Sequence, residues 1–207
     1  MKKTYFFATL LLIFIFSNTT FSQSLISDIR PGQLGSEPHD FESYNGKLYF
    51  SANDGTNGIE LWVYDPVTNA TTMAANIKSD AGSSLPLYKT VFDGKLFFAA
   101  DKIANTGGTR KELYYFNDNT NTITEVPTSA AVGNITEFDP KNLIVVNGAL
   151  YFDAIQSQGS GAATRKIFKY DGNELSLISL PSGIANNLYK GPYVKSGNYL
   201  FFYGILF

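Results

Sequence analysis

Oxygen-bearing side chains gather in one short loop, residues 53–58, with the sequence Asn-Asp-Gly-Thr-Asn-Gly. Calcium takes about six to eight oxygen ligands, several of them from carboxylates, so this acidic, glycine-rich loop is a candidate calcium site. The EF-hand spacing is not met, because the first three ligand positions would hold two asparagines and a glycine. The loops at equivalent places, 101–111 and 155–166, add only Asp101 as an acid. The sequence therefore favours a connecting loop of turn-forming residues, with a calcium site private to this loop as the alternative.

Basic residues stand in pairs at the same place in two later loops, as Arg110-Lys111 and Arg165-Lys166. If these four side chains lie on one rim of the fold, they form a candidate ligand surface for an anionic glycan. Ordinary solvated loop ends are the plainer interpretation.

The chain has few of the residue types that usually act in catalysis or bind metals. It has no cysteine and a single histidine, His39, so zinc sites and histidine-based triads are not expected. Paired carboxylates could serve glycoside hydrolysis, and residues 51–55 nearly match the sialidase Asp-box. In that pattern, however, Asp54 stands one place late and Trp62 too far on. We predict no catalytic residue, no cofactor and no metal ligand.

The N-terminus has the three parts of a secretory signal peptide. Two lysines are followed by an apolar run at 5–16 and by small residues at 20 and 22. The run is shorter than the roughly 20 residues that span a bilayer. Residues 1–22 are therefore predicted to be cleaved, and the mature chain is predicted to be secreted or displayed at the cell surface, without a transmembrane span.

The overall composition narrows the classes of partner. The formal net charge is -2, so no basic excess exists to hold a phosphate backbone, and nucleic acid is not expected. Without cysteine, an exported chain depends on its apolar core rather than on disulfides. The expected partner is an extracellular ligand, either a glycan or a protein.

A sequence motif recurs about every 50 residues. Asn45-Gly-Lys-Leu-Tyr-Phe is repeated as Asp93-Gly-Lys-Leu-Phe-Phe, as Asn147-Gly-Ala-Leu-Tyr-Phe and, loosely, around Gly197. Each copy has further aromatic-rich or β-branched runs before and after it, bounded by turn-forming residues. One unit is therefore predicted to be four short strands joined by tight turns.

Four strands in a repeat of this length are typical of a β-propeller blade. We predict an all-β, β-propeller-like array over residues 23–207. The predicted units lie at about 39–76, 87–126 and 141–179, with a partial unit at 192–207. Trp62, Tyr114 and Phe168 share one repeat position, and we expect them to pack between blades.

The array of units could end in one of two arrangements, a closed ring or an open arc. A predicted strand at 25–29 could join strands at 193–196 and 199–207 in a shared fourth blade. The alternative is an incomplete or truncated propeller, an open arc, because three full units are too few for the usual four to eight or so blades. The nearly all-apolar stretch 199–207 favours the arc, which would leave a bare strand through which chains self-associate.

The first unit resembles the ELWxxDGT repeat family of bacterial exported and surface proteins. The matching stretches are Asp28-Ile-Arg-Pro-Gly, Gly35-Ser-Glu-Pro, Asn45 to Gly55 and Gly58-Ile-Glu-Leu-Trp. The later units keep only the strand pattern. The resemblance implies a propeller-like β-repeat and export, and it implies no established catalytic residues. We therefore predict a non-enzymatic module for extracellular binding or adhesion, as such or as a fragment of a longer surface protein; the alternative is an extracellular propeller enzyme acting on polysaccharide.

Overall fold

The computed structural model describes residues 25–79, 82–101, 111–127, 138–156, 164–179 and 193–202. Over these ranges the chain forms fourteen β-strands. They are β1 His39–Tyr44, β2 Lys47–Asn53, β3 Ile59–Asp65, β4 Ala70–Ala75, β5 Leu87–Phe92, β6 Lys95–Asp101, β7 Lys111–Asn117, β8 Thr122–Glu125, β9 Lys141–Val146, β10 Ala149–Gln156, β11 Thr164–Tyr170, β12 Leu175–Leu177, β13 Val194–Ser196 and β14 Tyr199–Phe201. In the same ranges no helix is long and apolar enough to cross a membrane.

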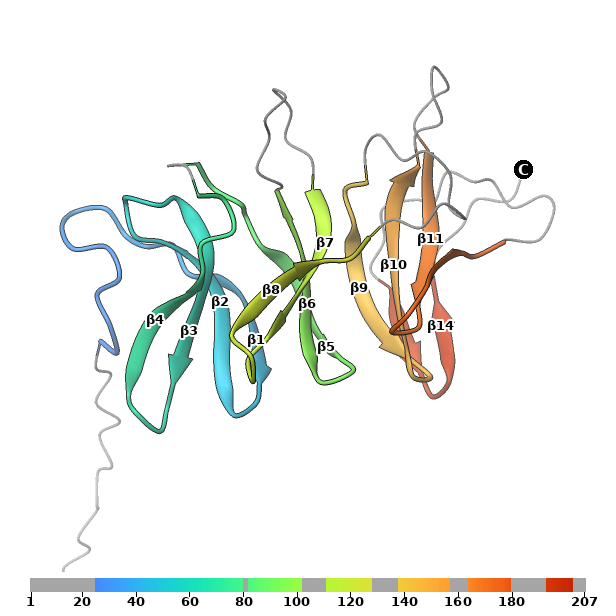
Figure 1. Ribbon diagram of the computed structural model, residues 1–207, viewed down its shortest axis with the longest axis horizontal. Coiled ribbons are helices and arrows are strands. Elements are labelled where there is room, and N and C mark those ends of the chain that lie inside the picture. Colours follow the sequence, from blue (N-terminus) through green and yellow to red (C-terminus); the bar gives the residue numbers. More distant parts are fainter. Residues whose placement is uncertain are drawn as a thin grey trace, which may run out of the picture.

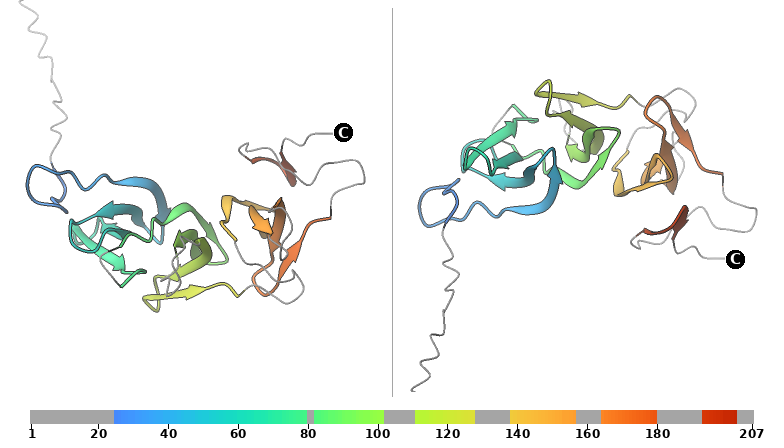
Figure 2. Two further views of the ribbon diagram at one scale, coloured as in Figure 1. Left: turned by 90° about the horizontal axis from the view of Figure 1, so that it is seen from above. Right: turned by 90° about the horizontal axis from the view of Figure 1, so that it is seen from below.

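The strands form three four-stranded antiparallel sheets and one two-stranded sheet. Each four-stranded sheet takes its strands in chain order, β1 to β4, β5 to β8 and β9 to β12, and β13 pairs with β14. The three four-stranded sheets follow one another along the longest axis, and the β13–β14 hairpin lies to one side of the third sheet (Figures 1 and 2). The predicted all-β, propeller-like array of four-stranded units is confirmed at this level.

The first two strands of each full unit are joined by a tight turn with an Asn-Gly or Asp-Gly pair. Asn45, Asp93 and Asn147 have φ of 49°, 48° and 47°, and the glycine after each also has positive φ. Two central residues with positive φ define the type I′ turn, whose twist matches that of the flanking strands. The predicted hairpin turns are therefore present, and they set the register of each unit.

The turn of the fourth unit lies where the strands predicted from sequence place it, but its glycine is shifted by one residue relative to the turn glycine of the other units. Ser196 pairs with Tyr199, so the two-residue turn is Gly197-Asn198, between the strands predicted at 193–196 and 199–207. Glycine, with φ of 57°, takes the first turn position, which is the usual arrangement of a type II′ turn. With this offset, Phe201 corresponds to Tyr49 of the first unit.

The predicted strand at 25–29 is wrong. Residues 25–38 are irregular and lie against the first sheet, where Leu25 and Ile29 line a pocket together with Phe50. Two prolines, Pro31 and Pro38, lack the backbone N–H that a ladder needs. The segment therefore covers the first sheet and does not join residues 193–202 in a shared blade; residues 203–207 lie outside the described part.

Each sheet has two faces. We call the face that packs on the preceding sheet in the second and third units the N-side face, and the opposite face, which packs on the next sheet in the first and second units, the C-side face; the equivalent faces of the other units keep these names. The N-side face of the second sheet packs on Tyr44, Tyr49 and Leu61 from the C-side face of the first sheet. The third sheet packs in the same way on Phe92, Phe97 and Leu113 of the second. In each N-side face the same five repeat positions are used: Leu96, Phe98, Ala100, Tyr114 and Phe116 in the second sheet, and Leu150, Phe152, Ala154, Phe168 and Tyr170 in the third.

Inter-blade packing is therefore confirmed for Tyr114 and Phe168. Trp62 holds the same repeat position in the first sheet and is also buried, at 9% exposure. Its cluster contains Phe50 and Ala52, with Ile29 of the irregular segment packed against it, rather than a preceding sheet. The prediction that Trp62 is a core residue is confirmed, but the partner is not another blade.

Buried polar side chains hold the first two sheets together. Lys89 Nζ, on β5, donates to Asp40 Oδ2 at 2.9 Å, to Pro86 O at 2.9 Å and to Ser51 Oγ at 2.7 Å. Burial lowers the pKa of the Lys89 ammonium, and the charge of Asp40 opposes this. The ion pair joins β1 of the first sheet to β5 of the second, the two strands at the first inter-sheet contact.

Candidate functional site

Two of the four residues of the predicted basic rim, Lys111 and Arg165, form ion pairs. Lys111 Nζ lies 3.1 Å from Asp101 Oδ1 and donates to Leu85 O at 3.2 Å. Lys166 is half-buried on β11, and burial lowers the pKa of its ammonium. Arg110 lies outside the described residues.

Arg165 is held inside its own unit. Its guanidinium donates to Asp153 Oδ2 and, at 3.0 Å, to Asp139 Oδ2. Burial lowers the pKa of Arg165, but the hydrogen bonds and charges of these two carboxylates outweigh burial and raise it. Lys111 and Arg165, two of the four residues of the predicted ligand rim, are therefore held in ion pairs with acids on neighbouring strands and loops.

The acidic loop at 53–58 closes on itself. The Asp54 carboxylate accepts hydrogen bonds from the backbone N–H of Thr56 at 2.8 Å and of Asn57 at 2.7 Å, and from the Asn57 amide at 2.7 Å. Burial raises the pKa of Asp54, but the Asn57 and Thr56 hydrogen bonds together outweigh it and hold the pKa below its usual value. Within the described ranges, no group of three or more His, Asp or Glu side chains could hold a metal ion.

We predict that removing divalent cations leaves the protein's stability unchanged. Asp54 stabilises the loop through local N–H donors, as an Asx-type turn does, and these donors need no metal. Thermal unfolding of the mature chain should give overlapping curves with and without EDTA. A fall of several degrees in Tm on adding EDTA would show that the loop holds a structural cation.

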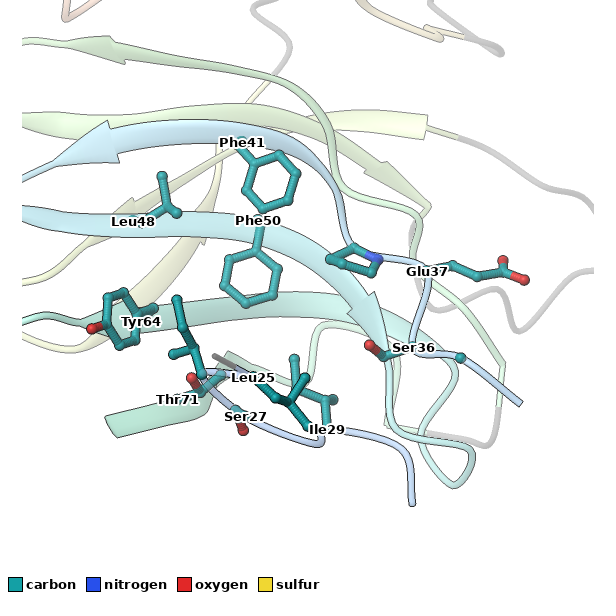
Figure 3. A pocket seen from close by; sticks show the side chains of 13 residues that line it. Leu25, Ser27, Ile29, Ser36, Glu37, Phe41, Leu48, Phe50, Tyr64 and Thr71 are labelled. Carbon is teal, nitrogen blue, oxygen red and sulfur yellow. The ribbon is translucent and has the colours of Figure 1, made fainter. Parts of the chain in front are cut away.

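A pocket of about 500 Å³ opens beside the first sheet, between its N-side face and the irregular segment 25–38. Strands β1, β2, β3 and β4 supply one side of it and the segment the other (Figure 3). The lining residues are Leu25, Ile26, Ser27, Ile29, Gly35, Ser36, Glu37, Pro38, Phe41, Leu48, Phe50, Tyr64 and Thr71. We call this the end pocket.

The repeat explains why the end pocket exists. Leu48, Phe50 and Tyr64 hold the N-side positions whose equivalents in the next two sheets are sealed by a preceding sheet. In the first sheet the segment 25–38 covers only part of this face. The pocket is therefore the space where a preceding blade would pack.

The end pocket is apolar and accessible. Phe41 is 53% exposed, and its ring lies 5.4 Å from that of Phe50, centroid to centroid. Leu25 and Ile26 are also exposed on the opposite wall. Glu37 is the one charged residue of the lining, and its side chain points away from the hollow (Figure 3).

Three of the four buried carboxylates of the described residues serve the fold. Glu60 binds backbone N–H groups of the connector to the second sheet, Asp101 pairs with Lys111, and Asp153 pairs with Arg165. None of these three points into the end pocket's lining. The pocket offers binding surface rather than acid–base groups.

Sequence analysis alone did not identify the end pocket. Phe41 and Tyr64 looked like ordinary strand aromatics, and their role depends on which end of the array they occupy. One signal was present: the first unit repeats the N-side positions of the later units although it has no earlier four-strand unit in the described chain to pack on.

No family model matches the chain, and no curated protein matches it. Among solved structures, it is similar to a novel α-L-arabinofuranosidase from Clostridium thermocellum, with 17% sequence identity and a TM-score of 0.37. The match covers 79% of this chain and 58% of that chain. So loose a superposition supports no statement about activity.

Proposed function

We propose that the chain is an exported, non-enzymatic β-repeat module that binds a protein partner through the end pocket. The observation that carries the proposal is the apolar N-side face of the first sheet, where Phe41 is exposed and Phe50 and Tyr64 line the end pocket. Exposed apolar patches of this kind, rimmed by polar residues, are typical of interaction sites. The resemblance of the first unit to exported ELWxxDGT repeats supports the same assignment.

A protein ligand suits this surface better than a glycan. An extended segment can place alternate side chains into an apolar groove at the side of a sheet. Glycan binding and cleavage need several polar groups or paired carboxylates converging on the sugar. The end pocket has one carboxylate in its lining, and the polar residues Ser27, Ser36 and Thr71 lie among aliphatic and aromatic neighbours.

Panning a random peptide library on sparsely immobilised mature chain tests the proposal. We expect enrichment of peptides with alternating aromatic or aliphatic residues. The affinity of such peptides should fall about tenfold or more in Phe41→Asp, because a charge at the pocket wall must be desolvated. Val67→Asp is the matched control, since Val67 is 91% exposed in the turn between β3 and β4.

Two results would contradict the proposed function. One is equal peptide binding by the wild type and by Phe41→Asp, which would place binding elsewhere. The other is release of sugar from arabinan or another plant polysaccharide by the purified chain, which would favour the enzyme alternative. Export is tested separately by N-terminal sequencing of the secreted protein, which should begin at Gln23.

A further inference from the structure

Adjacent sheets of the array are joined by a recurring aromatic pair. Tyr49, on the C-side face of the first sheet, lies 5.7 Å from Phe116 on the N-side face of the second, centroid to centroid. Phe97 of the second sheet lies 5.7 Å from Tyr170 of the third. In both pairs the first ring comes from the second strand of one unit and the other from the third strand of the next. Tilted pairs at this distance add stability beyond the area they bury.

Each end of the array presents half of such a pair. Tyr64 holds the position of Phe116 and Tyr170, and it lines the end pocket. Phe201, on β14, holds the position of Tyr49 and Phe97, and it is 55% exposed.

The exposed face of the β13–β14 hairpin is apolar and uncharged. Val194 pairs with Phe201 and Ser196 pairs with Tyr199, so these four side chains share one face. Val194 and Tyr199 are 54% and 73% exposed. Lys195 pairs with Leu200 and therefore belongs to the other face. None of the four described residues on this face carries a charge.

We propose that two copies of this chain join end to end, with the C-side face of one copy's β13–β14 hairpin seated in the end pocket of the other. Phe201 of the first copy then packs on Tyr64 of the second, which repeats the pair found between neighbouring sheets. The proposal rests on the proposed function, because it names the partner that the end pocket binds.

The geometry favours a second copy over the hairpin of the same copy. The hairpin lies beside the third sheet and the pocket beside the first, so the second sheet stands between the two along the longest axis (Figures 1 and 2). The contact is heterologous, since two different surfaces meet, and it leaves one free pocket and one free hairpin in every assembly. Such contacts add further copies rather than stopping at a symmetric dimer.

Complementation between two variants tests the proposal on the full mature chain. Phe201→Asp keeps a working pocket and disables the hairpin. Phe41→Asp and, as a second version, Tyr64→Asp keep a working hairpin and disable the pocket. Val67→Asp is the control, because it adds the same charge at an exposed apolar residue outside both faces.

Sedimentation velocity should show concentration-dependent association for the wild type and for Val67→Asp. Each disabling variant alone should be monomeric, with association weakened about a hundredfold or more, as for a central interface residue. An equimolar mixture of Phe201→Asp with Phe41→Asp should form a dimer and nothing larger. Circular dichroism and thermal unfolding check that every variant is folded.

Three results would overturn the proposal. The first is a wild type that stays monomeric at tens of micromolar or so. The second is association abolished by Phe201→Asp but kept by both pocket variants, because that pattern means hairpin pairs with hairpin. The third is a mixture that contains only monomers. Peptide binding by Phe201→Asp is measured in parallel, because it separates the proposed function from the end-to-end contact. If the end-to-end contact is overturned and this variant still binds peptides, the pocket binds proteins but not a second copy of this chain.

Discussion

Replacing Glu60 with alanine is expected to lower the free energy of unfolding by about 3 to 5 kcal/mol. The Glu60 carboxylate is fully buried and accepts hydrogen bonds from Ile77 N at 2.8 Å, Ser84 N at 3.0 Å and Ser84 Oγ at 2.6 Å. Alanine leaves these donors buried without an acceptor, and each buried donor left unpaired costs about 1 to 3 kcal/mol. Because Ser84 belongs to the connector leading to the second sheet, the loss should also loosen the contact between the first two sheets.

Urea unfolding of the mature chain measures this loss. Glu60→Gln should lose less, because its side-chain carbonyl can still accept one of the hydrogen bonds. Glu174→Ala is the matched control, since Glu174 is exposed in a turn, and its loss should stay within about 0.5 kcal/mol. A loss below about 1 kcal/mol in Glu60→Ala would show that water replaces the carboxylate and that Glu60 does not join the units.

Phe168→Ala is expected to cost about 4 kcal/mol, the usual range for deleting a large buried aromatic side chain. Phe168 is fully buried, with its ring stacked on that of Phe152 at 5.8 Å and edge-on to that of Phe138 at 5.3 Å. The cavity would lie between the second and third sheets, where neighbours on both sides are held by their own strands and cannot close it.

Trp62→Ala is the comparison at the same repeat position and should cost about 3 kcal/mol. Trp62 is covered on its N-side by the irregular segment, which can move into the space that alanine leaves. Urea unfolding of both variants tests the difference. Unchanged stability in Trp62→Ala together with lost peptide binding would instead make Trp62 part of the ligand surface rather than of the core.

The strands and their turns could be predicted from sequence because their signals are local. Asn-Gly and Asp-Gly pairs permit positive φ at both turn positions, and the aromatic and β-branched runs beside them suit strands. The repeat motif of the fourth unit matches the others only loosely, because Ser196-Gly197-Asn198 offers two possible turns. Only the pairing of β13 with β14 selects Gly197-Asn198.

Other features depend on contacts far apart in the chain. Each full unit has left-handed residues nine and six places before its turn glycine: Glu37 and Asp40, Leu85 and Tyr88, Asp139 and Asn142. Their residue types share no pattern that predicts positive φ, and Leu and Tyr rarely adopt it. The later residue of each pair stands where the pairing of β1, β5 or β9 with the next strand is irregular, as at a β-bulge.

The same limit applies to the candidate site. The basic residues at 111 and 165 share a repeat position, which predicted a common rim. Their acidic partners could not be inferred from that position, because Asp101 faces Lys111 only through strand register, and Asp139 reaches Arg165 from outside the pair of strands. The end pocket, in turn, follows from which face of the first sheet lacks a neighbouring sheet.

The fluorescence of Trp62 tests most directly that the end pocket receives the hairpin. Trp62 is the single tryptophan of the chain, and it faces Phe50 of the pocket across the β2–β3 pair. The titrant is a copy carrying Trp62→Phe and Phe41→Asp, which has no tryptophan emission and no working pocket but keeps its hairpin. The receiver is Phe201→Asp, which keeps Trp62 and the pocket but has no working hairpin. The emission of the receiver should shift to shorter wavelength and saturate at one titrant per receiver. An unchanged emission, or the same shift with a titrant that also carries Phe201→Asp, would contradict the assignment of this pocket as the docking site for the hairpin.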